Sequence, residues 1–179
     1  MKKLMIFVMS LFMAVSLHAQ FTGARLQATG LTCAMCSNAI NKALEKLPFV
    51  QTVRSDIKNS AFNIQFKEDS DVDPDEIKKA VENAGFAIGK LSITGNFNNV
   101  SVKNDEHIRI GNKNYHFLNI TGQVLDGEGT ITLADKDFVT DKEFKNFKSA
   151  TKMNCVNTGK AESCCAIADA GTRIYHVTI

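Results

Sequence analysis

The spacing at which apolar residues recur changes several times along residues 20–93. Residues 24–28 alternate one by one between apolar and polar side chains, which predicts a short strand. Between residues 36 and 47 the apolar positions recur every three or four residues, which predicts an amphipathic helix. Pro48 ends that helix, because proline lacks the backbone donor that a helix interior needs. The pattern therefore begins in the order strand, loop, helix.

Two further strands, a second helix and a last strand follow. Alternation predicts strands at 50–57 and 61–66. The second helix is bounded by Asp73 as its N-cap and by Gly85 just past its end. A strand at 86–93 completes the order βαββαβ, which indicates an α+β unit.

The pattern changes after this unit and predicts a small β-rich region. Residues 94–98 are rich in turn formers and predict a linker. Thr140 and Glu143 form a capping box, which predicts one helix. Short strand-like runs lie at 100–102, 107–110, 115–120, 123–125, 130–133 and 173–179. We interpret this region as a barrel or sandwich, with an oligonucleotide-binding-type barrel as the first choice. The stacking aromatics and basic groove of that barrel are not evident, so no nucleic-acid partner is expected.

Residues 1–19 have the pattern of a secretory signal. Lys2 and Lys3 precede an apolar run, and Ala19 offers a small residue at the cleavage point. The run is shorter than the roughly 20 residues that a membrane-spanning helix requires. We expect cleavage, no stable membrane insertion afterwards, and a periplasmic or secreted product.

Removal of the signal changes the charge of the chain. Residues 1–19 hold two of the 21 Lys and Arg residues and none of the 19 Asp and Glu residues, so the remainder is formally neutral. A neutral chain gives no support for a nucleic acid or an anionic membrane as partner. The remaining length exceeds what one βαββαβ unit requires, which predicts two domains at 20–94 and 95–179.

The candidate chemistry centres on Cys33 and Cys36, where the first strand leads into the first helix. Two thiols at this spacing can point at one ion, and Gly30 gives the backbone room to turn. Free N–H groups and the positive end of the helix dipole favour a thiolate at Cys36. Two soft sulfur ligands select Cu(I) among the common biological metals.

Other uses of a Cys-x-x-Cys pair fit less well. Haem attachment needs His after the second cysteine, where this chain has Ser37. Zinc needs further ligands, and no nearby His, Asp or Glu supplies them. A thiol–disulfide oxidoreductase stays open as an alternative. Resemblance to thioredoxins would require a proline facing the pair, and Pro48 and Pro74 are placed at helix ends instead.

The stretch from Gly30 to Cys36 resembles the GMTCxxC signature of the heavy-metal-associated domain family. Members include copper chaperones, copper-pump N-terminal modules and the periplasmic mercury-binding protein. The resemblance covers residues 23–93 and implies a ferredoxin-like fold, with Cys33 and Cys36 as metal ligands. It also implies Cu(I) as cargo, with Hg(II) as the alternative. Transfer by thiolate exchange to a metal-transporting pump or another soft-metal protein is implied as well.

Three positions of this chain can be compared with the residues that the family carries there. Leu31 stands where the family usually has Met, at similar volume. Thr32, rather than an acidic residue, precedes Cys33, which by resemblance favours Cu(I) or Hg(II) over zinc. Phe86 lies where family members carry Tyr, Phe or Lys near the metal loop. For Phe86 we favour core packing over shielding of the metal.

Cys155, Cys164 and Cys165 share a predicted loop with Met153. In an oxidising compartment we expect a disulfide from Cys155 to Cys164 or Cys165, which leaves one thiol over. The alternative is a second Cu(I) site formed by the three thiolates and the Met153 thioether.

No other residues indicate a reaction centre. His107, His116 and His176 have no ligand partner at a recognisable spacing, and we interpret them as structural or surface residues. Nothing resembles a Ser/His/Asp set, a phosphate-binding glycine loop or a paired carboxylate site. The prediction is a non-enzymatic, exported carrier or buffer of Cu(I), with an Hg(II) scavenger and a thiol–disulfide oxidoreductase as alternatives.

Overall fold

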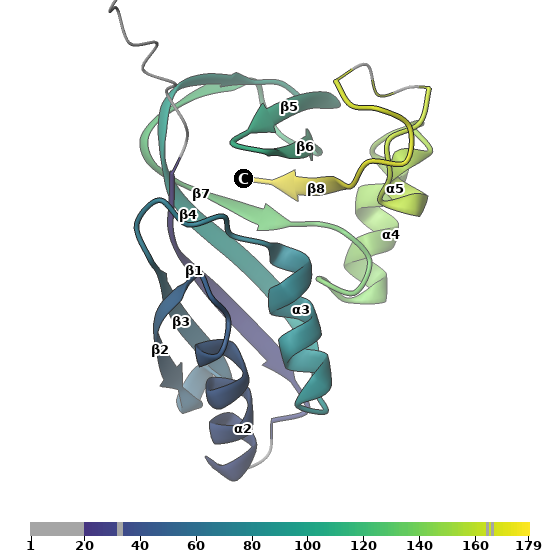
Figure 1. The fold of residues 1–179 in the computed structure, drawn as a ribbon. Helices are drawn as coiled ribbons and strands as arrows, with labels where there is room; N and C mark the ends of the chain where they lie inside the picture. Colours follow the sequence, from purple (N-terminus) through teal and green to yellow (C-terminus); the bar gives the residue numbers. More distant parts are fainter. Residues whose placement is uncertain (1–19, 32–33, 164, 166) are drawn as a thin grey trace, which may run out of the picture.

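One eight-stranded sheet runs through the computed structural model, which describes residues 20–31, 34–163, 165 and 167–179. The strand order is β2-β3-β1-β4-β7-β8-β6-β5 (Figure 1). The strands are β1 Gln20–Thr29, β2 Val50–Asp56, β3 Ala61–Phe66, β4 Ala87–Val102, β5 Glu106–Ile110, β6 Lys113–Phe117, β7 Gln123–Leu133 and β8 Ile174–Thr178. The helices are α2 Ala34–Glu45, α3 Pro74–Asn83, α4 Asp141–Ser149 and α5 Cys155–Thr158, with a 3-10 turn η1 Ile57–Asn59. The predicted signal segment lies outside the described residues.

The first half has the predicted βαββαβ order. Helices α2 and α3 cover one face of the strands β2-β3-β1-β4 (Figure 1). Ile40 and Leu44 of α2, with Ile77 and Val81 of α3, are fully buried against that face. The apolar faces of both helices therefore pack into one core. The α+β prediction is confirmed.

The predicted linker at 94–98 is wrong, because these residues lie inside the 16-residue strand β4. Gly95 pairs with Gly129 of β7. A Cβ on Gly95 would lie 2.9 Å from a ring carbon of Phe21, and one on Gly129 would lie 3.0 Å from the ring of Phe97. The glycines let aromatic rings lie over the paired strands, so they mark close packing rather than a flexible connection.

The asparagines that follow in β4 form a bulge. The register with β7 shifts between Phe97 and Val100, and Asn99 has a left-handed φ of 50°. Asparagine tolerates this backbone conformation better than most residues do. Bulges bend a strand and increase its twist, and Figure 1 shows β4 curving over toward β5.

The second half extends the same sheet instead of forming the predicted separate barrel or sandwich. β7 pairs with β4, and β8 pairs antiparallel with β7 and parallel with β6. The runs predicted at 123–125 and 130–133 merge into β7, and the short α5 adds a second helix to the predicted one. The division at residue 94 stays a prediction. Within the described ranges, no helix combines the length and the apolar character that crossing a bilayer requires.

Polar contacts connect the start of α3 to β8. Nε of Arg173 lies 2.8 Å from Oδ2 of Asp75, and Nη2 lies 3.1 Å from Oδ1. The Tyr175 hydroxyl donates to Oδ1 of Asp73 at 2.9 Å. Burial opposes ionisation of Asp75, but the Arg173 hydrogen bonds and charge hold the pKa of this carboxyl below its usual range. The forked ion pair therefore joins the two halves across the fold.

Asp75→Asn should lower the free energy of unfolding by about 1 kcal/mol, which is less than a buried charged hydrogen bond contributes, because Asp75 is partly exposed. Since the folded-state pKa of Asp75 is lowered, its contribution is present above about pH 4 and is lost as the pH falls through the lowered pKa. Urea unfolding of both proteins at pH 7 and pH 3 measures this difference. Asp137→Asn is the matched control, because Asp137 makes only an exposed pair with Lys78. Equal effects of the two substitutions at pH 7 would contradict the assigned role of Arg173–Asp75.

Candidate metal sites

The first candidate site is the loop between β1 and α2. Gly30 follows β1 with a left-handed φ of 81°, which glycine adopts without strain. Leu31 packs against the main core, as expected for a substitute of the family Met. Cys36 lies in the first turn of α2 and is half-buried. Thr32 and Cys33 lie outside the described residues, so the pairing of the two sulfurs stays a prediction.

The surroundings of Cys36 are set by the start of α2 and by the neighbouring Met35. The first turn of α2 contains no acidic side chain, so the positive end of the helix dipole is not offset there. The neighbouring Met35 is 83% exposed. The start of α2 therefore combines an uncompensated positive helix end with an exposed neighbouring side chain.

Phe86 lies next to the start of the same loop. Thr29 at the end of β1 pairs with Ala87 at the start of β4, which brings Phe86 near Gly30. The Phe86 side chain is half-buried and packs against the main core, which confirms the expected packing role.

Comparison with known proteins identifies this part of the chain. Residues 25–87 match the family model of the heavy-metal-associated domain. Residues 25–87 form a heavy-metal-associated domain. The match of this domain to the βαββαβ order of β1 to β4 confirms the ferredoxin-like prediction for the first half.

Curated relatives of the heavy-metal-associated domain are much longer proteins. A copper-transporting ATPase of Helicobacter pylori is 34% identical over 58 residues, which are 32% of this chain and 8% of the ATPase. A probable copper-transporting ATPase, HMA5, of Arabidopsis thaliana is 35% identical over 63 residues, which are 35% of this chain and 6% of that protein. The chain thus spans less than a tenth of their length.

Solved structures with similarity to this chain include a metallochaperone and a copper transporter domain. The CopZ metallochaperone is 26% identical, with 36% of this chain and 94% of that chain covered and a TM-score of 0.33. The yeast copper transporter domain Ccc2a is 28% identical, with 37% and 90% covered and a TM-score of 0.34.

The second candidate site lies in the C-terminal half, where the sequence predicted a cysteine-rich loop. Cys155 is fully buried at the start of α5, and Cys165 is 3% exposed. Both belong to a small core with Ile174, and Met153 packs against it. Of the residues predicted for a second site, these three come together, while Cys164 lies outside the described residues.

Three histidines form a row across adjacent strands of the sheet beside these thiols. His107 of β5 pairs with His116 of β6, and His116 pairs with His176 of β8. The rings of His107 and His116 stack with their centroids 4.1 Å apart. The rings of His116 and His176 lie edge to face with their centroids 5.1 Å apart. His116 and His176 are fully buried, and His107 is half-buried.

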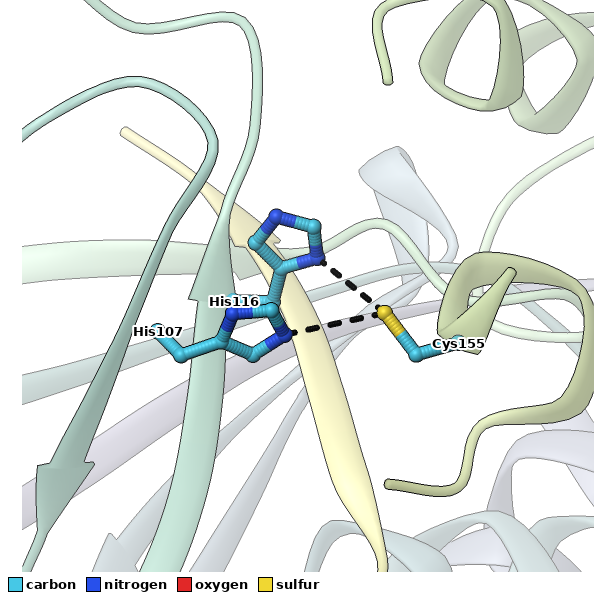
Figure 2. A group of neighbouring side chains, drawn as sticks. All are labelled: His107, His116 and Cys155. Atoms are coloured by element: carbon cyan, nitrogen blue, oxygen red, sulfur yellow. Dashed lines mark hydrogen bonds between the residues drawn. The ribbon is translucent and has the colours of Figure 1, made fainter. Parts of the chain in front are cut away.

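Two of these imidazoles converge on Cys155 (Figure 2). Cys155 Sγ lies 3.6 Å from Nε2 of His107 and 3.6 Å from Nδ1 of His116. Cys165 Sγ lies 3.3 Å from the same Nε2 of His107. Sequence spacing did not indicate this partner for His107 and His116, because only the fold brings Cys155 to both rings. Their interpretation as structural or surface residues stays a prediction.

Carboxylates hold two of the rings from the other side. His116 Nε2 lies 2.9 Å from Oδ1 of Asp105, and His176 Nδ1 lies 2.7 Å from Oδ1 of Asp135. Burial, together with the neighbouring His107 and His176, lowers the pKa of His116 to about 4, against the opposing effect of Asp105. Burial also lowers the pKa of His107. Both imidazoles that face Cys155 are therefore uncharged at neutral pH.

One sequence signal points to this arrangement in hindsight. Gly111 and Asn112 form a two-residue connection between β5 and β6, and His107 and His116 are equally distant from it. A hairpin centred there places the two rings opposite each other on one face. No local pattern connects that hairpin to Cys155, which lies 39 residues beyond His116.

The His116 ring should titrate with a midpoint near pH 4 in the metal-free folded protein. Because the folded-state pKa lies below the ordinary value of 6.5, the folded protein should lose stability as the pH falls from about 6.5 to 4. Imidazole NMR resonances followed from pH 8 to 3.5 measure the midpoint, with the urea-unfolded chain as the control. A His116 midpoint near 6.5 in the folded protein would show that the ring is not buried as described.

Proposed function

We propose that this chain binds Cu(I) through Cys33 and Cys36 and carries or buffers it in the periplasm or outside the cell. The observation that carries the proposal is a heavy-metal-associated domain at residues 25–87 that contains this thiol pair. The apolar run at residues 1–19 supports export.

Transfer would proceed by thiolate exchange at the loop. An acceptor cysteine of the partner binds Cu(I) as one cysteine of this chain leaves, so the ion is never released into water. The half-buried position of Cys36 and the exposure of Met35 favour such an approach. A metal-transporting pump or another soft-metal protein would be the partner. The proposed role is that of a binding protein rather than an enzyme.

We propose Cu(I) rather than Hg(II) as the cargo for two reasons, the names of the relatives and the type of ligand. The relatives of the heavy-metal-associated domain described above are named as copper-transporting proteins. Two sulfur ligands without a carboxylate in the first turn of α2 suit a soft ion of low coordination number. Hg(II) shares this preference for sulfur and is the competing cargo in the experiment below.

Anaerobic titration of the full chain with Cu(I), in competition with a chromogenic chelator, tests the proposal. We expect one tight equivalent that Cys33→Ser or Cys36→Ser weakens by more than tenfold, or about 1.4 kcal/mol, because one of two thiolates is lost. Asn38→Ser, on the exposed side of the same helix, should leave the affinity unchanged.

Two results would contradict this proposal. Cu(I) binding that is weak and insensitive to Cys36→Ser, together with a readily reversible Cys33–Cys36 disulfide, would favour the oxidoreductase alternative. Tight binding of Hg(II) at the pair without tight binding of Cu(I) would favour the mercury scavenger.

A further inference from the structure

We propose that His107, His116, Cys155 and Cys165 form a second metal site, which holds one thiophilic ion through two imidazole nitrogens and two thiolates. This site lies beside α5, β5 and β6, at the opposite end of the molecule from the start of α2 (Figure 1). It is independent of the Cu(I) carrier function proposed for the first half.

The ligand atoms already have the spacing that a bound ion requires. The donor atoms of His107, His116 and Cys155 all lie within 4.8 Å of one another. Metal–sulfur and metal–nitrogen bonds of about 2.3 and 2.1 Å in a tetrahedron place sulfur and nitrogen roughly 3.6 Å apart. The three sulfur–nitrogen separations are 3.6, 3.6 and 3.3 Å. An ion can therefore enter between His107, His116 and Cys155 without a rearrangement of the strands, and Cys165, which contacts His107, would move toward it as the fourth ligand.

Asp105 orients the His116 ring in the way that is typical of a metal ligand. A carboxylate only accepts hydrogen bonds, so the 2.9 Å contact places the proton of His116 on Nε2. The lone pair is then left on Nδ1, the nitrogen that faces Cys155. Carboxylate–histidine pairs of this kind fix the tautomer and raise the basicity of metal-bound imidazoles.

The scaffold around the ligands is rigid and closed. The β5–β6 pairing places His107 opposite His116, and the two rings stack. Cys155 is held at the start of α5, whose last turn is closed by Gly159 N–H donating to the Cys155 carbonyl at 2.7 Å. Cys155 and His116 are fully buried, in contrast to the half-buried Cys36. This burial suits an ion that is retained, whereas the first loop suits one that is transferred.

The donor set favours Zn(II) and also accepts Cu(I). Two thiolates with two imidazoles in a tetrahedron are typical of zinc sites. Sulfur-only sets favour Cu(I), so the two sites of this chain should differ in their metal preference. Both ions share the chemistry of a d¹⁰ cation bound by sulfur and nitrogen, and the experiment separates them.

Two metal-free arrangements use the same residues and compete with this proposal. In one, the Cys155 thiol donates to Nδ1 of His116 and the ring of His107 donates to a sulfur. In the other, Cys155 and Cys165 form a disulfide. Neither arrangement binds a metal ion in the reduced protein, so metal titration distinguishes them from the proposed site.

The test uses the reduced full chain with Cys33→Ser and Cys36→Ser, which removes the first site. We expect this variant to bind one equivalent of Co(II), with the intense visible bands of a tetrahedral site and a sulfur-to-cobalt charge-transfer band. Zn(II) should displace the Co(II). A parallel Cu(I) titration against a chelator measures the second ion, and the tighter binding of the two identifies the preferred metal.

His107→Gln should weaken Co(II) binding more than tenfold, because it removes a ligand from a half-buried position without opening the core. Cys165→Ser should remove the fourth ligand and reduce the charge-transfer intensity. Asp105→Asn should weaken binding about tenfold with one equivalent still bound, since the carboxylate positions His116 and is not a ligand. Asparagine suits the left-handed φ of 61° at position 105. Arg109→Gln is the matched control, because it introduces the same residue at an exposed position of β5 and should change nothing.

Circular dichroism and melting curves of each variant show whether the fold is retained. The proposal is overturned if the folded double variant binds no Co(II), Zn(II) or Cu(I), or if His107→Gln binds as tightly as Arg109→Gln. A Cys155–Cys165 disulfide that persists in reductant would overturn it too. Because the double variant lacks Cys33 and Cys36, none of these results bears on Cu(I) binding at the first loop.

Discussion

Strand β4 is hydrogen-bonded along both edges, and the rest of the structure depends on this double pairing. β1 pairs with one edge from Asn96 back to Ala87, and β7 pairs with the other from Ser92 to Val102. A βαββαβ unit alone would leave the β4 edge with unpaired N–H and C=O groups, which invites pairing with other chains. Here β7 covers that edge, so one sheet and one main core extend through both halves.

Local signals were sufficient for the first half and insufficient for the second. Pro48, Asp73 and the apolar periodicity of α2 and α3 act within a few residues, so their elements could be predicted closely. Gly95 was interpreted as a linker residue, because its real role depends on a distant partner. Gly95 accommodates a ring from β1, and Asn99 belongs to a bulge opposite β7. Long-range strand pairing carries no local signature, which is why a linker was predicted inside the continuous strand β4.

The two candidate sites also differ in how far the local sequence predicted them. Cys33 and Cys36 lie in one contiguous motif, so spacing and family resemblance were enough to propose them, and the match of residues 25–87 supports that proposal. His107, His116 and Cys155 come from three elements that only the folded sheet brings together. Cysteine content allowed a soft-metal site near Cys155 only as the alternative to a disulfide, and the imidazole groups required the register of the β5–β6 hairpin.

One sheet thus carries two proposed metal sites of different chemistry, a sulfur-only pair for transfer and a buried sulfur–nitrogen cluster for retention. We propose that Cu(I) binds at Cys33 and Cys36. Copper K-edge X-ray absorption of the full chain, loaded with less than one equivalent of Cu(I), distinguishes the two sites. We expect scattering from two sulfur neighbours and no imidazole contribution. Imidazole scattering from the bound copper would place the ion at His107 and His116 and contradict the assignment of the carrier site.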